Sequence, residues 1–134
     1  MDYPSKVLIV GGLLNLLAGI GTGMVMAQMR NTAPTVPRPL TLAHMAGYMQ
    51  APILFGLVLV VQLSDLRQGW ESIAAWLFVV GSLMLILKDL LNWRQKVEDE
   101  FEKPRPIGYH LGSAQAVAQV VGITILIVGV LKGL

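Results

Sequence analysis

The sequence contains no cysteine, only two histidines and few charged residues. Charged side chains make up 13% of the 134 residues, whereas an ordinary soluble domain carries about 25%. The absence of cysteine excludes disulfides, thiolate catalysis and cysteine-ligated metals. The net charge of +2 is too small to indicate a nucleic-acid-binding protein. Hydrophobic residues account for 54% of the chain, more than so short a chain can bury, which indicates a lipid bilayer as solvent.

The apolar residues fall into four blocks, at about residues 7–28, 41–63, 72–93 and 110–131. Each block is near the roughly 20 residues that an α-helix needs to cross a membrane. We therefore expect an all-α fold, with one membrane domain over residues 1–134 forming an up-down bundle of four transmembrane helices. The first block could be a signal peptide. Its length and the lack of a clear cleavage site favour a retained helix.

Four spanning helices alternate in direction, so the first and third loops lie on one side of the membrane and the second loop lies with both termini on the other. The first side carries more basic residues, namely Arg30, Arg38, Arg94, Lys96, Lys103 and Arg105, against Lys6, Arg67 and Lys132. The positive-inside rule then places the first and third loops in the cytoplasm and the termini outside. We expect an integral protein of a bacterial inner membrane. The acidic run EDEFE at residues 98–102 is interpreted as a solvated surface.

Polar residues gather at the end of the bundle that carries the first and third loops. His44 starts the second helix, His110 precedes the fourth, and Lys88, Asp89 and Asn92 end the third. Because polar groups in a spanning helix are costly and usually face a cavity, a functional site is expected there. The alternatives are an interfacial His44, a solvated His110 and a Lys88 that reaches the headgroups.

Positions 44, 47, 48 and 51 share one face of the second helix. Gly47 and Ala51 are small, so a large flat molecule could lie against this face beside His44 and Tyr48, with Gln50 flanking it. The alternative is that Gly47 and Ala51 serve close helix packing.

Two other helices carry stripes of residues with a similar spacing. Asn15, Gly19 and Gly23 form a packing face on the first helix. Gln115, Gln119 and Gly122 form a stripe on the fourth that suits hydrogen bonds between helices.

The stretch AHMAGYMQ, with Ala43-His44, Gly47 and Gln50, resembles the start of the second helix in the styrene oxide isomerase and hydroxylaminobenzene mutase family. Asn92-Trp93 is similar to an Asn-Trp pair of the mutase branch. Members of this family are small membrane proteins of four helices. The family usually has Asn where this chain has Gln50.

The resemblance implies haem b bound at the interfaces of a homotrimer, with His44 as the axial iron ligand. Gln50 would occupy an amide position near the haem, beside Gly47 and Ala51, and Asn92 would occupy a polar position in the pocket. The implied reaction is a rearrangement of a small lipophilic substrate, either of an epoxide to an aldehyde or of a hydroxylaminoarene to an aminophenol.

The chain departs from the family pattern around the third helix. Lys88 and Lys96 stand where the isomerase pattern has an aspartate and a substrate-orienting tyrosine. Asp89 is one position away. Tyr48 and Tyr109 are the nearest candidates for the tyrosine's role, although neither matches it by position. The predicted catalytic residues are therefore Asn92, Tyr48 and Lys96.

Two other functions remain open. One is a membrane haem protein for electron transfer or haem handling, with His110 as a second ligand. The other is a structural membrane protein without a cofactor. A small multidrug exporter would need a glutamate in the first helix, and residues 7–27 contain no acidic residue.

Overall fold

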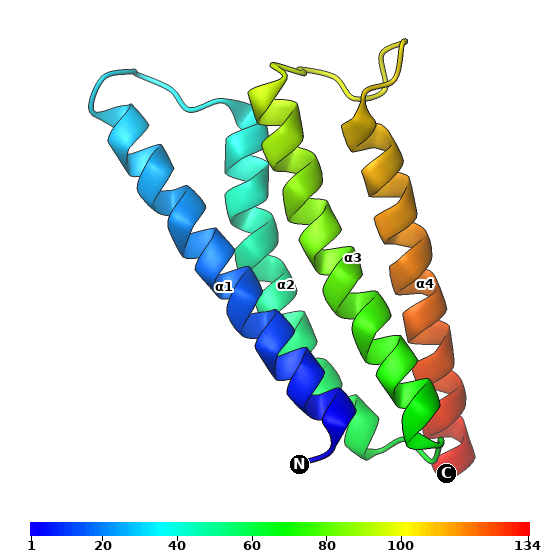
Figure 1. Cartoon of the computed structure of the whole chain (residues 1–134). Coiled ribbons are helices and arrows are strands. Elements are labelled where there is room, and N and C mark those ends of the chain that lie inside the picture. The colour runs from blue at the N-terminus through cyan, green and yellow to red at the C-terminus, as the bar shows by residue number, and fades with distance from the viewer.

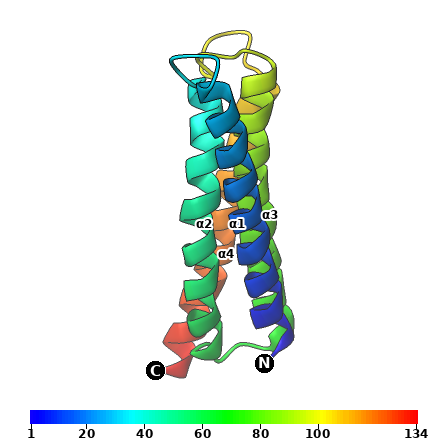
Figure 2. The ribbon, with the colours of Figure 1, turned by 90° about the vertical axis from the view of Figure 1, so that its left-hand side faces the viewer.

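The computed structural model describes all 134 residues and contains four α-helices and no strand. The helices are α1 (Tyr3–Arg30), α2 (Arg38–Gln62), α3 (Gln68–Arg94) and α4 (Ile107–Gly133). Successive helices run in opposite directions, and both termini lie at the same end as the short loop between α2 and α3 (Figures 1 and 2). The all-α class and the up-down topology predicted from the sequence are confirmed.

Three of the four helices extend beyond the predicted blocks at both ends, and α2 extends only at its start. At the start of α1, the carboxylate of Asp2 accepts a hydrogen bond from the Ser5 amide over 2.9 Å, and Pro4 lies in the first turn. At the start of α2, Pro37 is the N-cap and Pro39 lies in the first turn. Both caps are compatible with a helix start. Hydropathy marks only the apolar part of a helix and therefore misses these polar first turns.

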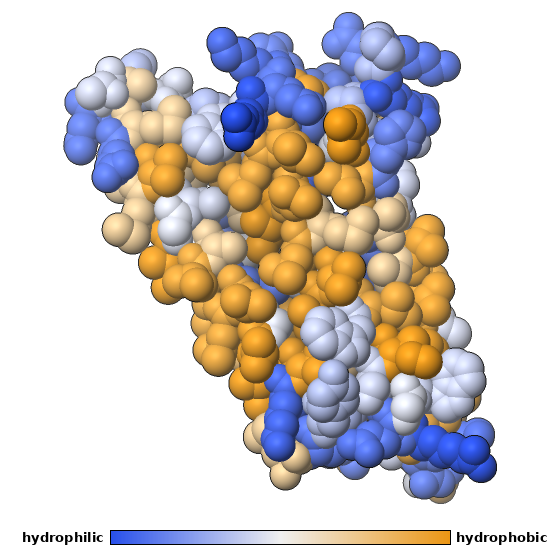
Figure 3. Space-filling model, in the orientation of Figure 1, coloured by the Kyte–Doolittle hydropathy of each residue, from blue (hydrophilic) through white to orange (hydrophobic).

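The helices are 25 to 28 residues long. At 1.5 Å per residue, each is longer than the roughly 30 Å of hydrocarbon in a bilayer. On the face shown in Figure 3, a belt of hydrophobic side chains covers the middle of the molecule, between hydrophilic surfaces at its two ends. All four helices are thus long and apolar enough to span a membrane.

The bundle is not closed on all sides. α1 packs on α2 and α3, and α4 packs mainly on α3, with a small contact to α2 and none to α1. In Figure 1, α1 and α4 form opposite edges of the molecule. The apolar part of α4 is only 17% buried, against 39–44% for the other helices. The α4 face therefore meets lipid or another protein.

Hydrophobic packing is uneven along the bundle axis. The main core lies in the half near the termini and consists of Val7, Leu8, Leu54, Leu57, Val61, Ala74, Ala75, Phe78, Val79 and Leu126. A smaller cluster of Ala43, Ala46 and Ile86 lies toward the first and third loops. Polar side chains take up much of the space at that second end.

Each helix places a polar residue within two positions of its midpoint, and these residues form a midplane layer. The layer consists of Asn15, Gln50, Ser82 and Gln119. Asn15 donates a 2.8 Å hydrogen bond from its amide to the Ser82 hydroxyl, and Gln119 donates a 3.1 Å bond to Gln50. Hydrogen bonds between amides and hydroxyls stabilise helix pairs in a medium that offers no water.

Candidate functional site

The imidazole of His44 lies between α1 and α2. His44 belongs to the second turn of α2 and is half-buried. Its Nδ1 lies 2.7 Å from the carbonyl oxygen of Gly19 in α1. Because a carbonyl oxygen only accepts hydrogen bonds, Nδ1 carries the proton, and the neutral ring keeps its lone pair on Nε2. Nε2 makes no hydrogen bond with the protein and is not fully buried.

Two glycines of α1, Gly19 and Gly23, form the surface against which the rings of Tyr48 and His44 pack. A Cβ atom at Gly23 would lie 2.8 Å from Cε1 of the His44 ring. A Cβ atom at Gly19 would lie 3.0 Å from the ring of Tyr48. The two rings of α2 meet edge to face, with centroids 5.0 Å apart. The small-residue stripe of α1 is a packing face, as predicted, and it also makes room for the imidazole.

Gly47 and Ala51 do not clear space for a ligand, so that prediction is wrong. Both are buried, and a Cβ atom at Gly47 would lie 2.7 Å from the Asn15 carbonyl oxygen and the Gly19 amide nitrogen. Gly47 therefore allows the backbones of α1 and α2 to approach closely. The alternative reading, that these residues serve helix packing, describes the structure.

Gln50 points away from the imidazole. Its side chain is 9% exposed and accepts a hydrogen bond from Gln119 of α4, and Gln119 in turn accepts a 2.7 Å bond from Gln115. Gly122, one turn further along, packs against Phe78. The predicted role of the α4 stripe in helix contacts is thus confirmed, whereas the structure does not bring Gln50 to the His44 side of α2.

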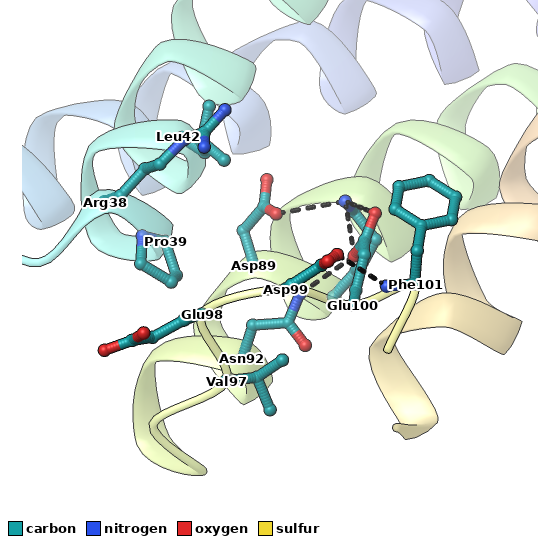
Figure 4. A pocket seen from close by; sticks show the side chains of 11 residues that line it. Arg38, Pro39, Leu42, Asp89, Asn92, Val97, Glu98, Asp99, Glu100 and Phe101 are labelled. Carbon is teal, nitrogen blue, oxygen red and sulfur yellow. Dashed lines mark hydrogen bonds and ion pairs between the residues drawn. The ribbon is translucent and has the colours of Figure 1, made fainter. Parts of the chain in front are cut away.

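A separate polar recess of about 210 Å³ lies between the start of α2, the end of α3 and the 97–101 loop (Figure 4). Glu100 is its central group. The Glu100 carboxylate accepts two 3.1 Å hydrogen bonds from the Lys88 ammonium and a 3.0 Å bond from the Asn92 amide. Lys88 also lies 3.2 Å from a carboxylate oxygen of Asp89. These contacts hold the loop against the end of α3.

Two interpretations of this region are corrected by the network. The Lys88 ammonium does not end free at the surface, because it is paired with Glu100 and Asp89 and the side chain is only 12% exposed. Glu100 belongs to the acidic run that was interpreted as a solvated surface, yet its side chain is only 21% exposed. A lysine inside an apolar block requires a counter-charge. This requirement was the one feature of the sequence that could have predicted a buried acidic partner such as Glu100.

The remaining predicted site residues lie apart from His44. Asn92 is buried beside Glu100, and its carboxamide packs against Gly108 at the start of α4. Lys96 is exposed in the turn after α3. His110 is exposed and packs on Tyr109. Because α1 and α4 make no contact, the structure does not bring His110 to the α1–α2 seam that holds His44.

The donor set at His44 fits one kind of metal centre. The chain has no cluster of three or more His, Asp or Glu side chains that could hold a bare metal ion. A haem iron already has four ligands from its macrocycle and takes a single imidazole from the protein. A metal-bound histidine usually donates its other ring N–H to a carbonyl or carboxylate, which fixes the ring and its tautomer. The bond from His44 to Gly19 has this form.

Comparison with family models, with curated proteins and with solved structures finds no match.

Proposed function

We propose that this chain is a membrane haem b protein that isomerises a small lipophilic substrate, with His44 as the axial ligand. The observation that carries the proposal is the 2.7 Å contact between His44 Nδ1 and the Gly19 carbonyl oxygen. It leaves the Nε2 lone pair unused, and the half-buried ring keeps this atom accessible at the α1–α2 seam. The resemblance of the Ala43-His44 pair to the isomerase family supports the same assignment.

Each part of the α1–α2 seam would have a distinct role in such a reaction. Nε2 of His44 would bind the iron, the Gly19 carbonyl would hold the ring plane, and the exposed ring of Tyr48 would supply an apolar wall. The haem, when bound, would supply a Lewis acid for the oxygen of an epoxide or a hydroxylaminoarene, and the rearrangement needs no net redox change. Surrounding lipid and apolar side chains would deliver the substrate and exclude water.

Five recesses of the chain are defined by their lining residues, and His44 lines none of them. A haem on this histidine would therefore lie on the outer surface of the α1–α2 pair, and a neighbouring copy would have to cover it. We accordingly include a homo-oligomer, a trimer by resemblance, in the proposal. The catalytic roles of Asn92 and Lys96 stay predictions. In the single chain, the recesses that these two residues line do not include His44.

The first experiment is the visible spectrum of the detergent-purified protein, expressed with added haem. We expect an intense Soret band that is lost or shifted in His44→Ala and unchanged in the matched variant His110→Ala. Loading of the wild type would then be followed by assays with epoxides and hydroxylaminoarenes. A low-spin, six-coordinate spectrum that is lost in His110→Ala would favour electron transfer. A wild type that remains colourless on haem titration would refute the haem assignment and leave a structural membrane protein.

We also propose that the first and third loops face the cytoplasm of a bacterial inner membrane. Six basic residues lie in or directly beside the first and third loops, and three lie in or beside the second loop and the termini. Because the chain has no cysteine, Lys103→Cys and Arg67→Cys each introduce a single thiol. An impermeant thiol reagent added to intact cells should label the cysteine at position 67 only. Labelling at position 103 instead would reverse the orientation.

A further inference from the structure

Two basic side chains without an acidic partner line the same recess at the loop end of the bundle. The recess has a volume of about 660 Å³ and lies between the start of α2, which carries Arg38, and the end of α3, which is followed by Lys96. Both ion pairs of the chain use Lys88, so neither Arg38 nor Lys96 is paired. The backbone N–H of Arg38, at the first position of α2, also has no hydrogen-bond acceptor.

Lys96 has a backbone conformation that favours glycine. Its φ angle is 55°, and it is the only non-glycine residue with a positive φ. Together with the Val97 N–H bond of 2.9 Å to the Asn92 carbonyl, it closes the last turn of α3. Glycine is the usual residue at this position of a helix end, because a Cβ atom is strained there. A lysine at such a position therefore points to a role for its side chain.

The surroundings of the recess match the interfacial layer of a membrane. Trp93, in the last turn of α3, lines the recess together with Pro37 and Pro39. Tryptophan is enriched where hydrocarbon meets headgroups. The lining residues belong to the start of α2 and the end of α3, and the hydrophobic surface gives way to a hydrophilic one at that end of the molecule (Figure 3). Such a position would bring the phosphates of neighbouring lipids to the level of the two basic residues.

The charges of the lining residues favour an anion. Glu98 is the single acidic residue of the recess, against Arg38 and Lys96. Glu100, in the same loop, already accepts hydrogen bonds from Lys88 and Asn92 and does not line this recess. A guanidinium forms directed, charge-assisted hydrogen bonds with phosphate oxygens, and an ammonium adds a point charge.

We propose that this recess binds the phosphate group of an anionic membrane phospholipid, held by Arg38 and Lys96 and flanked by Trp93. Basic pockets between transmembrane helices bind anionic headgroups in this way. The acyl chains would extend from the headgroup along the apolar belt. The proposal is independent of haem binding, because His44 does not line this recess.

The test uses the whole protein in nanodiscs of phosphatidylglycerol and phosphatidylcholine in equal amounts, followed by native mass spectrometry of the retained lipid. The wild type should retain phosphatidylglycerol preferentially. Arg38→Gln combined with Lys96→Gln should weaken that preference roughly 30-fold, from the usual contribution of two basic residues beside anionic lipid. The matched control is Arg30→Gln with Lys103→Gln, which removes the same charge at the same end of the bundle from exposed residues outside this recess. Equal retention by both double variants would refute the proposal.

A single variant separates the charge of Lys96 from its effect on the fold. Lys96→Gly removes the ammonium and suits the left-handed backbone, so the variant should unfold at a higher temperature in neutral detergent. It should also lose the stabilisation that added phosphatidylglycerol gives to the wild type. If Lys96→Gly keeps the full response to the lipid, Lys96 is not a ligand. If excess inorganic phosphate displaces the retained lipid, the site is one for soluble anions and the lipid assignment is wrong.

Discussion

Gly47→Ala tests the close approach of α1 and α2, on which the position of His44 depends. The added methyl group would lie 2.7 Å from the Asn15 carbonyl oxygen and 2.8 Å from the Gly19 Cα. All its near neighbours are backbone atoms, so no flexible side chain can move aside. An ordinary contact begins at 3.4 Å, and the two helices must therefore separate locally by about 0.7 Å, the difference between 3.4 and 2.7 Å.

The expected loss of unfolding free energy follows from a comparison with Gly56→Ala in the same helix. A Cβ atom at Gly56 would meet nothing within 4 Å. Both substitutions gain about 0.5–1 kcal/mol from the helix propensity of alanine. Only the change at Gly47 adds the cost of overpacking, typically about 1–3 kcal/mol. The free energy of unfolding of Gly47→Ala should therefore lie about 1–3 kcal/mol below that of Gly56→Ala.

The assay is equilibrium unfolding in mixed detergent micelles, monitored by the fluorescence of the three tryptophans. The same preparations can be titrated with haem. Separation of the helices should lengthen the hydrogen bond from Nδ1 of His44 to the Gly19 carbonyl and loosen the imidazole. Haem affinity should fall in Gly47→Ala and not in Gly56→Ala. Equal unfolding free energies for the two variants would show that α1 and α2 do not pack at Gly47 as described.

Three further results are expected. Gly23→Ala should reduce haem loading, because its methyl group would displace the imidazole. In the control Gly21→Ala the added methyl group meets nothing within 4 Å, so this variant should load haem like the wild type. Equal loading of the two variants would show that Gly23 does not make room for His44 as a haem ligand. A double-mutant cycle of Gln50→Leu and Gln119→Leu should give a coupling of about 0.6 kcal/mol in unfolding free energy, and a coupling of zero would exclude their hydrogen bond. Glu100→Gln should lower the unfolding free energy by about 1–3 kcal/mol, since a partly buried ammonium loses its main counter-charge; a change of less than a few tenths would show that the loop contact is not stabilising.

The fold was predictable because the membrane imposes strong rules on sequence. Four apolar blocks of the right length predict four helices, and their number alone predicts which loops share a side. The ends of the helices were less predictable. The first turns of α1 and α2 are polar or proline-rich, and their caps are local features that hydropathy does not register.

The site was predictable only in part, because spacing shows which residues share a face but not what the face meets. Gly47 and Ala51 share a face with His44, yet both are buried, and Gly47 lies against the backbone of α1. The contact between His44 and Gly19 depends on the rotation of two helices about their axes, which no local pattern fixes. Glu100 reaches Lys88 through an irregular loop, so only the need of the lysine for a counter-charge pointed to such a partner.

The midplane layer has a consequence for how the chain assembles. Its two bonds between helices, from Asn15 to Ser82 and from Gln119 to Gln50, each join the α1–α2 hairpin to the α3–α4 hairpin. Sliding one hairpin past the other by a single turn, about 5.4 Å, would break both bonds and leave the Gln50 side chain without its hydrogen-bond partner in hydrocarbon. The layer therefore fixes the register of one hairpin against the other. A chain cut in the loop between Gln62 and Gln68 is expected to reassemble from its two hairpins in this one register.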